Sequence, residues 1–234
     1  MKYLCTAPWT HTYVSPQGER RLCCASREES DFQKQYLDTG EQNINPTFSP
    51  VALKDHWNSE YMKDIRKRML AGEAIPQCVV CNENVLNLHT YRSYFVDTLF
   101  PHKIQDIIDK TDETGYTTMV PVSYDYRLSN LCNFKCRMCG DQLSSSWEAE
   151  NKVNNRMQDQ PWLQPNNRRK ITNFQKEVLE EELQAAVDQD VIEEIYWVGG
   201  EPLMWERHWT IMDQLKDSPN KENITIRYNT NLSR

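Results

Sequence analysis

The chain has no long apolar run, no excess of positive charge, no internal repeat and no low-complexity tract. No hydrophobic stretch approaches the ~20 residues that a membrane-spanning helix needs. The N-terminal segment MKYLCTAPW has no apolar stretch long enough for a signal peptide. A net charge of −7 argues against a general nucleic-acid-binding protein. We therefore expect a cytoplasmic protein with no membrane segment and no nucleic-acid partner.

The composition allows a substantial core. Hydrophobic residues make up 38% of the chain and aromatic residues 10%, which excludes wholesale disorder. A length of 234 residues suits one large domain or two small ones. The stretch 111–118 is polar and contains Gly115, so we place a domain boundary there, between residues 1–115 and 116–234.

The eight cysteines are the most informative residues. An even number would suit disulfides in a secreted protein, but there is no export signal and the spacings are typical of metal ligands. Cys132, Cys136 and Cys139 follow the pattern C-x3-C-x2-C. Three thiolates can hold three irons of a four-iron cluster and leave the fourth iron open to a small molecule. Zinc is the alternative, but it usually takes four ligands.

The second half of the chain alternates strands and helices, which predicts a parallel sheet with right-handed crossovers. The expected elements are a strand over 120–128, helices over 143–155 and 173–188, a strand over 192–198, a helix over 206–216 and a strand over 224–228, with 156–171 irregular. Sites in such sheets lie at the carboxyl ends of the strands. The cysteine loop and Gly199-Gly-Glu-Pro202 each follow a strand, so we expect them to meet on one rim.

The glycine-rich segment has two interpretations. Gly199 and Gly200 would let the backbone approach a ligand closely, and the Glu201 carboxylate or nearby carbonyls could accept from an ammonium group. The alternative is a tight turn with Pro202 near the start of a helix. Asn229, with the two residues after it, either faces a ligand from the same rim or caps the third strand.

Both motifs resemble those of the radical S-adenosylmethionine (SAM) enzymes. The resemblance implies that Cys132, Cys136 and Cys139 ligate a [4Fe–4S] cluster whose open iron chelates SAM. It also implies that the segment 199–202 helps to bind SAM and that Met138 lies near the adenine. Electron transfer into SAM would generate a 5′-deoxyadenosyl radical, which abstracts hydrogen from a peptide or small-metabolite substrate. An external donor such as flavodoxin or ferredoxin would supply the electron.

A second set of cysteines lies in the N-terminal part. Cys5, Cys23, Cys78 and Cys81 resemble the twitch module, a shortened relative of the SPASM extension, which would hold an auxiliary [4Fe–4S] cluster with all four irons ligated. Two cysteine pairs also suit zinc. Cys24 is a spare, an alternative ligand or a small buried hydrophobe.

The local pattern of the N-terminal part would bring these cysteines together. Val14–Leu22 predicts a hairpin that joins the first two cysteines, with the turn at Ser15-Pro-Gln-Gly18. A helix over 58–71 would return the chain to the second pair. Further helices are expected over 83–96 and from Pro101 to about Lys110.

The expected fold is α/β: a partial parallel β/α barrel, truncated after about three strands, with a small Cys-rich α+β module in front. The family's core has more strands, so the chain would be a fragment, be completed by a second chain, or be a degenerate product. An open third strand would expose a hydrogen-bonding edge. The alternative function is therefore a non-catalytic iron–sulfur or zinc protein that needs a partner chain.

Overall fold

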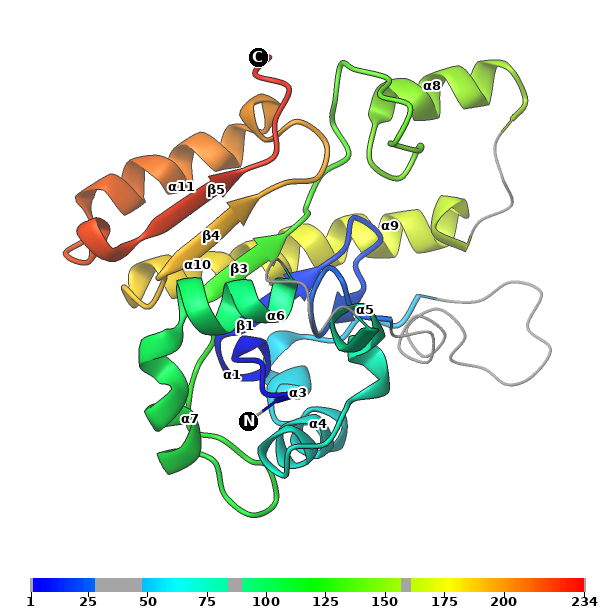
Figure 1. Ribbon diagram of the computed structural model, residues 1–234. Coiled ribbons are helices and arrows are strands. Elements are labelled where there is room, and N and C mark those ends of the chain that lie inside the picture. The colour runs from blue at the N-terminus through cyan, green and yellow to red at the C-terminus, as the bar shows by residue number, and fades with distance from the viewer. Residues whose placement is uncertain (1, 28–47, 84–89, 157–160, 234) are drawn as a thin grey trace.

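A five-stranded sheet runs through the protein (Figure 1). The computed structural model describes residues 2–27, 48–83, 90–156 and 161–233. The strands lie in the order β2-β1-β3-β4-β5, and only β2 is antiparallel to its neighbour. Their bounds are β1 His11–Val14, β2 Arg20–Arg21, β3 Ser123–Tyr126, β4 Glu194–Trp197 and β5 Thr225–Tyr228. The sheet is mostly parallel and open, so the predicted α/β class is confirmed and the form is that of a partial β/α barrel.

The C-terminal elements follow the predicted pattern. Strands β3, β4 and β5 each lie inside a predicted strand. Helix α8 (Ser145–Val153) and helix α11 (Glu206–Asp217) match the predicted helices to within a few residues. Short 3-10 helices, Pro202–Met204 and Lys221–Asn223, flank α11.

The prediction of an irregular stretch over 156–171 is wrong for its second part. After a short 3-10 helix, Pro161–Leu163, helix α9 begins at Pro165 and runs to Phe174. A π-helical segment, Gln175–Leu179, joins it to α10 (Glu180–Asp188). Proline at the first helical position needs no hydrogen bond from its nitrogen and already has the helical φ, so it starts this helix.

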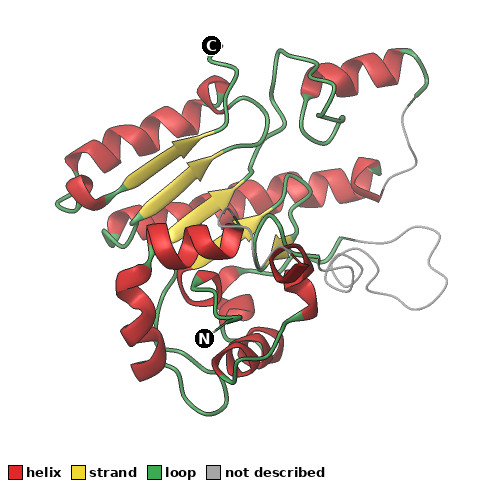
Figure 2. Cartoon of the chain, viewed as in Figure 1, coloured by secondary structure: helices red, strands yellow, loops and turns green. Residues whose placement is uncertain are grey.

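The three helices α9, α10 and α11 cover one face of the sheet (Figure 2). Alternate strand residues point to that face, because side chains in a strand alternate with a period of two. The buried residues there include Tyr124, Tyr126, Ile195, Trp197, Leu179, Leu183, Ile211 and Leu215. The other strand positions, which carry polar side chains, face the N-terminal part of the protein.

The N-terminal part joins the same sheet. Helix α1 (Ala7–Thr10) leads into β1, which pairs in parallel with β3 over four residues. The predicted hairpin is confirmed: β1 and β2 are antiparallel, and the N–H of Gly18 donates to the Ser15 carbonyl at 2.9 Å. The pairing of β1 with β3 was not foreseen, and the boundary near residue 115 stays a prediction.

Short helices pack beneath this hairpin. The predicted helix over 58–71 is confirmed as α4 (Glu60–Leu70), with Ser59 as its cap. The prediction over 83–96 falls partly on residues outside those described. The remaining elements are α3 Leu53–Trp57, the 3-10 helix Pro76–Cys78, α5 Val79–Glu83, α6 Tyr91–Ser93, the π-helical segment Tyr94–Leu99, the 3-10 helix Pro101–Lys103 and α7 Ile104–Asp109. Among the described residues, no helix has the length and apolar character to cross a membrane.

A buried ion pair fastens the hairpin to the helical layer. Arg20 donates to the Glu182 carboxylate at 2.7 Å and also to the hydroxyls of Thr12 and Tyr126. The same carboxylate accepts from the Tyr126 hydroxyl and from the Leu53 N–H. Five segments therefore share one polar network. A buried pair of this kind is costly to break, because the remaining charge keeps its desolvation penalty.

We expect Arg20→Met to lower the free energy of unfolding by about 3 kcal/mol, because Glu182 would stay buried without its cation. Urea unfolding followed by circular dichroism measures this change. Arg169→Met, on the exposed side of α9, is the matched control and should change it by less than ~0.5 kcal/mol. Equal losses in the two variants would contradict a role for the buried pair.

Candidate functional site

Three segments meet where β3, β4 and β5 end (Figure 1). The N–H of Glu201, after β4, donates to the carbonyl of Leu131 in the cysteine loop at 2.7 Å. The side-chain amide of Asn231, after β5, lies 3.3 Å from Asn133 Oδ1 and 3.6 Å from Cys132 Sγ. The rim expected from the strand–helix pattern is therefore present, and it is built by direct hydrogen bonds.

The start of α8 holds the cysteine loop. Ser145 Oγ accepts from the Cys132 N–H at 3.0 Å, and Ser146 Oγ donates to the Cys132 carbonyl at 2.8 Å. Trp147 Nε1 donates to the Cys136 carbonyl at 2.8 Å. Backbone groups of the loop would otherwise need water as partner. Sequence reasoning missed these side chains, although a run of serines before a helix is a typical capping signal.

The three thiols of this loop differ in exposure. Cys132 is buried, Cys139 is half-buried and Cys136 is exposed. Burial, followed by the neighbouring thiols of Cys136 and Cys132, raises the pKa of Cys139. The N–H of Phe134 donates to Cys132 Sγ at 3.4 Å. Among the described residues, no three His, Cys, Asp or Glu side chains form a group that could hold a metal ion, so ligation by these thiols stays a prediction.

Gly199 and Gly200 bring the turn after β4 against the cysteine loop. Both have positive φ, +93° and +57°. A Cβ on Gly200 would lie 2.5 Å from the Leu131 carbonyl oxygen, and one on Gly199 would lie 2.8 Å from Arg127 Cβ. The close approach that glycine permits is therefore made to the chain's own backbone.

The Glu201 carboxylate is committed to the protein. It is buried and accepts from the Leu203 N–H, the Thr230 hydroxyl and the Asn231 N–H. Because its oxygens already have these donors, it fastens the turn to the end of β5 and is a poor acceptor for a ligand. The carbonyls of Gly199 and Gly200 accept no hydrogen bond from the described residues.

The other predicted residues of this rim are arranged less tightly. Pro202 starts a 3-10 helix, as the turn interpretation predicted. Met138 is 91% exposed, so its side chain is accessible from solvent. Asn229 is exposed and donates its backbone N–H to Trp197, as a strand-ending residue does. It is Asn231, not Asn229, whose side chain contacts the cysteine loop.

The four N-terminal cysteines line one cavity, together with Arg92 and Tyr91. Cys5 precedes α1, Cys23 follows β2, Cys78 ends a 3-10 helix and Cys81 lies in α5. The chain segments that carry them are joined by a hydrogen bond from the Arg27 N–H to the Gln77 carbonyl at 2.9 Å. The predicted set is thus gathered from three separate places in the sequence, because Cys78 and Cys81 lie only three positions apart.

Burial disfavours charged thiolates in this cavity, and one buried arginine beside the thiols opposes that effect. Burial raises the pKa of Cys5 to about 12, and the thiols of Cys78 and Cys81 add to the increase. The Arg92 guanidinium opposes this effect. Arg92 is itself buried, and its Nε has no hydrogen-bond partner among the described residues. A buried cationic donor without an acceptor fits thiolates around a cluster, which carry negative charge.

Cys24 does not line this cavity. It is half-buried and forms a hydrogen bond with the hydroxyl of Tyr91. Burial raises the pKa of its thiol, and the nearby carboxylate of Asp125 raises it further. Cys24 therefore lies between the four-cysteine cavity and the polar face of the sheet.

Family models match the chain in two places. A model of the radical SAM superfamily matches residues 126–234, and a model of the SPASM iron–sulfur cluster-binding domain matches residues 5–82. No curated protein and no solved structure matches the chain. The chain is a radical SAM superfamily protein with a SPASM-like iron–sulfur module at its N-terminal end, and the resemblance stated from the cysteine spacings is confirmed. The superfamily is one of enzymes that use iron–sulfur clusters and SAM.

We expect Gly200→Ala to loosen the cysteine loop, because a Cβ would press on the Leu131 carbonyl in a positive-φ turn. The strain and the overpacking together should lower the free energy of unfolding by about 2–4 kcal/mol. Trypsin cleavage at Lys135 and Arg137 should also become faster. Gly140→Ala is the control in the same loop, since its Cβ would meet no atom closer than 3.9 Å. Unchanged cleavage in Gly200→Ala would contradict the packing argument.

Proposed function

We propose that the protein cleaves SAM reductively at a [4Fe–4S] cluster held by Cys132, Cys136 and Cys139. The supporting observation is that one rim brings the three-cysteine loop against a turn whose two glycine carbonyls have no donor among the described residues. A bound cluster of this kind supplies the electron that breaks the sulfonium bond, and the resulting 5′-deoxyadenosyl radical abstracts hydrogen from the substrate.

The chain's own residues would bind and orient SAM. The carbonyls of Gly199 and Gly200 can accept from its ammonium group, while Glu201 keeps the turn in place through its three donors. The exposed thioether of Met138 can pack on a flat ring such as adenine. We also assign Asn229 and Pro202 to the SAM-binding rim. Pro202 would contribute through its position in the turn after β4.

Hydrogen bonds to sulfur would adjust the cluster's potential. Phe134 N–H and the Asn231 amide both point to Cys132 Sγ. Donors to ligand sulfurs stabilise the more negative, reduced state of a cluster, which raises its reduction potential. Two donors at one ligand therefore favour acceptance of an electron from an external protein such as flavodoxin or ferredoxin.

We further propose that Cys5, Cys23, Cys78 and Cys81 ligate an auxiliary [4Fe–4S] cluster, in a module over 1–115 in front of the core over 116–234. Support comes from the single buried cavity that these residues line and from the unpartnered Nε of Arg92 beside it. With every iron ligated, this site would transfer electrons to or from a peptide or small-metabolite substrate.

The alternative is a non-catalytic iron–sulfur or zinc protein that needs a partner chain. It is favoured by β5, which has β4 as its one neighbour in the described sheet and leaves an open edge. The two proposals differ in whether SAM is bound and cleaved.

Iron and sulfide analysis of anaerobically reconstituted protein, with electron paramagnetic resonance spectra before and after SAM is added, separates them. We expect roughly eight irons per chain and a spectrum that changes with SAM, as two four-iron clusters with one open iron require. A spectrum without response to SAM, or no 5′-deoxyadenosine after dithionite reduction, would contradict the enzyme. Zinc without iron or sulfide would favour a zinc-stabilised interaction module.

Single cysteine variants test the assignment of the ligands. We expect Cys136→Ala to lose about half of the iron and all SAM cleavage, because it removes one of three ligands at the open cluster. Cys78→Ala should keep the SAM-responsive cluster. Cys24→Ala is the matched control, because its thiol lies outside the four-cysteine cavity, and it should keep all the iron. Loss of both clusters in Cys78→Ala would contradict two separate sites.

A further inference from the structure

The face of the sheet that α9–α11 do not cover carries two buried carboxylates, each paired with an arginine. Asp125 on β3 accepts two hydrogen bonds from Arg127, both at 3.0 Å. Glu194 on β4 accepts from Arg227 Nε on β5 at 2.6 Å. Both carboxylates are only 1% exposed in their side chains. This face of the sheet therefore carries several charges, and the two carboxylates and the two arginines neutralise one another.

Arg227 has donors that the described residues leave without an acceptor. Its guanidinium carbon lies 4.1 Å from the ring centre of Tyr196 and 4.8 Å from that of Tyr94. Its Nε is bound to Glu194, and its two terminal nitrogens have no acceptor among the described residues. Aromatic stacking and the ion pair hold the planar group in one orientation, so its outer edge is a preorganised fork for a carboxylate.

That edge opens into a cavity. Arg227 lines a space of about 330 Å³ together with Tyr91, Tyr94, Asp97 and Thr98. This volume is at the lower end of the range for small-molecule sites. Among the described lining residues there is one cation, Arg227, and one carboxylate, Asp97. One charge of each sign favours a zwitterion, because the Asp97 carboxylate repels a second negative charge.

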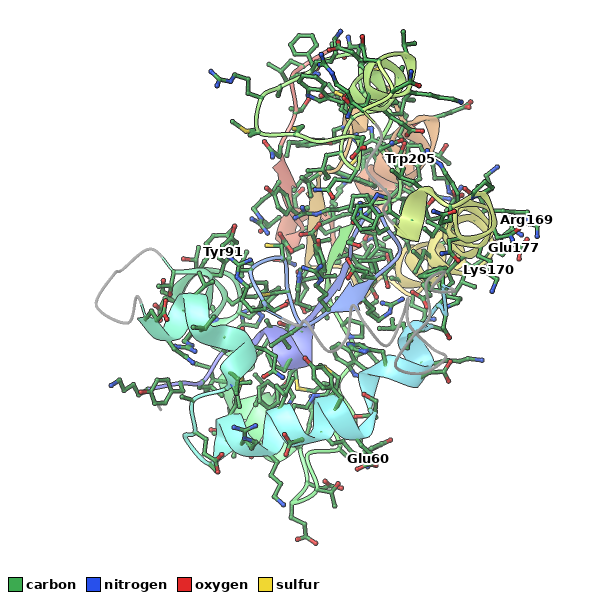
Figure 3. All side chains as sticks on the ribbon, turned by 90° about the vertical axis from the view of Figure 1, so that its right-hand side faces the viewer. Glu60, Tyr91, Arg169, Lys170, Glu177 and Trp205 are labelled. Atoms are coloured by element: carbon green, nitrogen blue, oxygen red, sulfur yellow. The ribbon has the colours of Figure 1, made fainter. Side chains whose placement is uncertain are left out.

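The cavity also adjoins the N-terminal cysteine site. Tyr91 lines both this cavity and the cavity of the four N-terminal cysteines. Strand β5, which carries Arg227, continues into Asn231, whose side chain contacts Cys132. Figure 3 shows Tyr91 on the opposite side of the sheet from Arg169, Lys170 and Glu177, which project from the helical layer. A ligand held by Arg227 would therefore adjoin the four-cysteine cavity and lie on the strand that leads to the rim with Cys132.

We propose that this cavity binds the amino-acid end of the substrate, with its carboxylate on the terminal nitrogens of Arg227 and its ammonium group toward Asp97. The side chain of the ligand would pack on Tyr91 and Tyr94. The inference rests on the proposed function in naming this ligand a substrate, and it narrows the substrate class to free α-amino acids, which carry the carboxylate and the ammonium group on one residue.

Anaerobic equilibrium dialysis of the reconstituted protein against four probes tests this site. The probes are phenylalanine, phenylalaninamide, 3-phenylpropionate and phenyl phosphate. We expect phenylalanine to bind and the amide to bind at least about tenfold more weakly, since a charge-assisted hydrogen-bonded pair would be lost. No binding of phenylalanine, equal binding of acid and amide, or tighter binding of phenyl phosphate would overturn the proposal.

Variants test the two charged groups separately. Arg227→Met should weaken phenylalanine at least about tenfold, and Arg169→Met on the far side of the sheet should leave it unchanged. Arg227→Lys keeps a cation beside the buried Glu194 but lacks the planar fork, so it should also weaken binding if Arg227→Met fails to fold. Asp97→Asn should weaken phenylalanine but not 3-phenylpropionate, which has no ammonium group. Equal effects on both ligands would overturn the role of Asp97.

The two proposals fail in different ways. The response of the paramagnetic resonance spectrum to SAM is recorded on the same samples and should be unchanged in Arg227→Lys. If the wild-type protein distinguishes acid from amide but gives no response to SAM, the binding site is supported and the enzyme is not. If the response is present and acid and amide bind alike, the enzyme is supported and the site is not.

Discussion

The parallel pairing of β1 with β3 is the constraint on which the rest of the structure depends. It joins residues more than a hundred positions apart, from His11↔Ser123 to Val14↔Tyr126. Because the two strands run in the same direction, the segments after them leave the sheet on the same side. The turn of the hairpin and the start of the loop that carries Cys132 are thereby set side by side, and Pro16 and Gln17 line one cavity with Asn130. This pairing, together with the Arg20–Glu182 ion pair, holds the two cysteine sites in one body.

This pairing also adds buried polar groups to the inner sheet face. Once β1 lies beside β3, His11 and Ser123 become neighbours and share a hydrogen bond of 2.7 Å. Burial, followed by the charges of Arg227 and Arg127, lowers the pKa of His11 to about 3, so the imidazole is neutral near pH 7. Burial raises the pKa of Asp125, while Arg127 opposes the shift. A sheet face with apolar side chains would pack without the desolvation penalty that these buried ion pairs carry. A role in binding therefore explains the buried ion pairs better than a role in stabilising the fold does.

Local patterns predicted the elements of the core well, and the contacts between distant segments poorly. The periodicity of apolar residues in a strand or a helix can be recognised within a short stretch of sequence. Because each of the two motifs directly follows a predicted strand, the sequence was enough to predict that they share one rim. The place of β1 in the sheet depends on pairing across the whole chain, for which a four-residue strand has no local signal. The same limit applies to Glu201, whose donors come from β5, and to Arg227, whose value as a ligand site depends on Tyr94 and Tyr196. Two missed features had usable signs, namely the proline at the first position of α9 and the serines at the start of α8.

The two cysteine sets differ in the way that their proposed tasks require. Cys5 and Cys81 are buried, so a fully ligated cluster there would be shielded and Arg92 would offset its charge. The loop from Cys132 to Cys139 lies at the rim, with Cys136 exposed, where an open iron can meet a ligand from solvent. Burial favours long-lived electron storage, and exposure favours exchange. The cavity lined by Arg227 shares Tyr91 with the four-cysteine cavity, so a substrate bound there would adjoin the proposed auxiliary cluster.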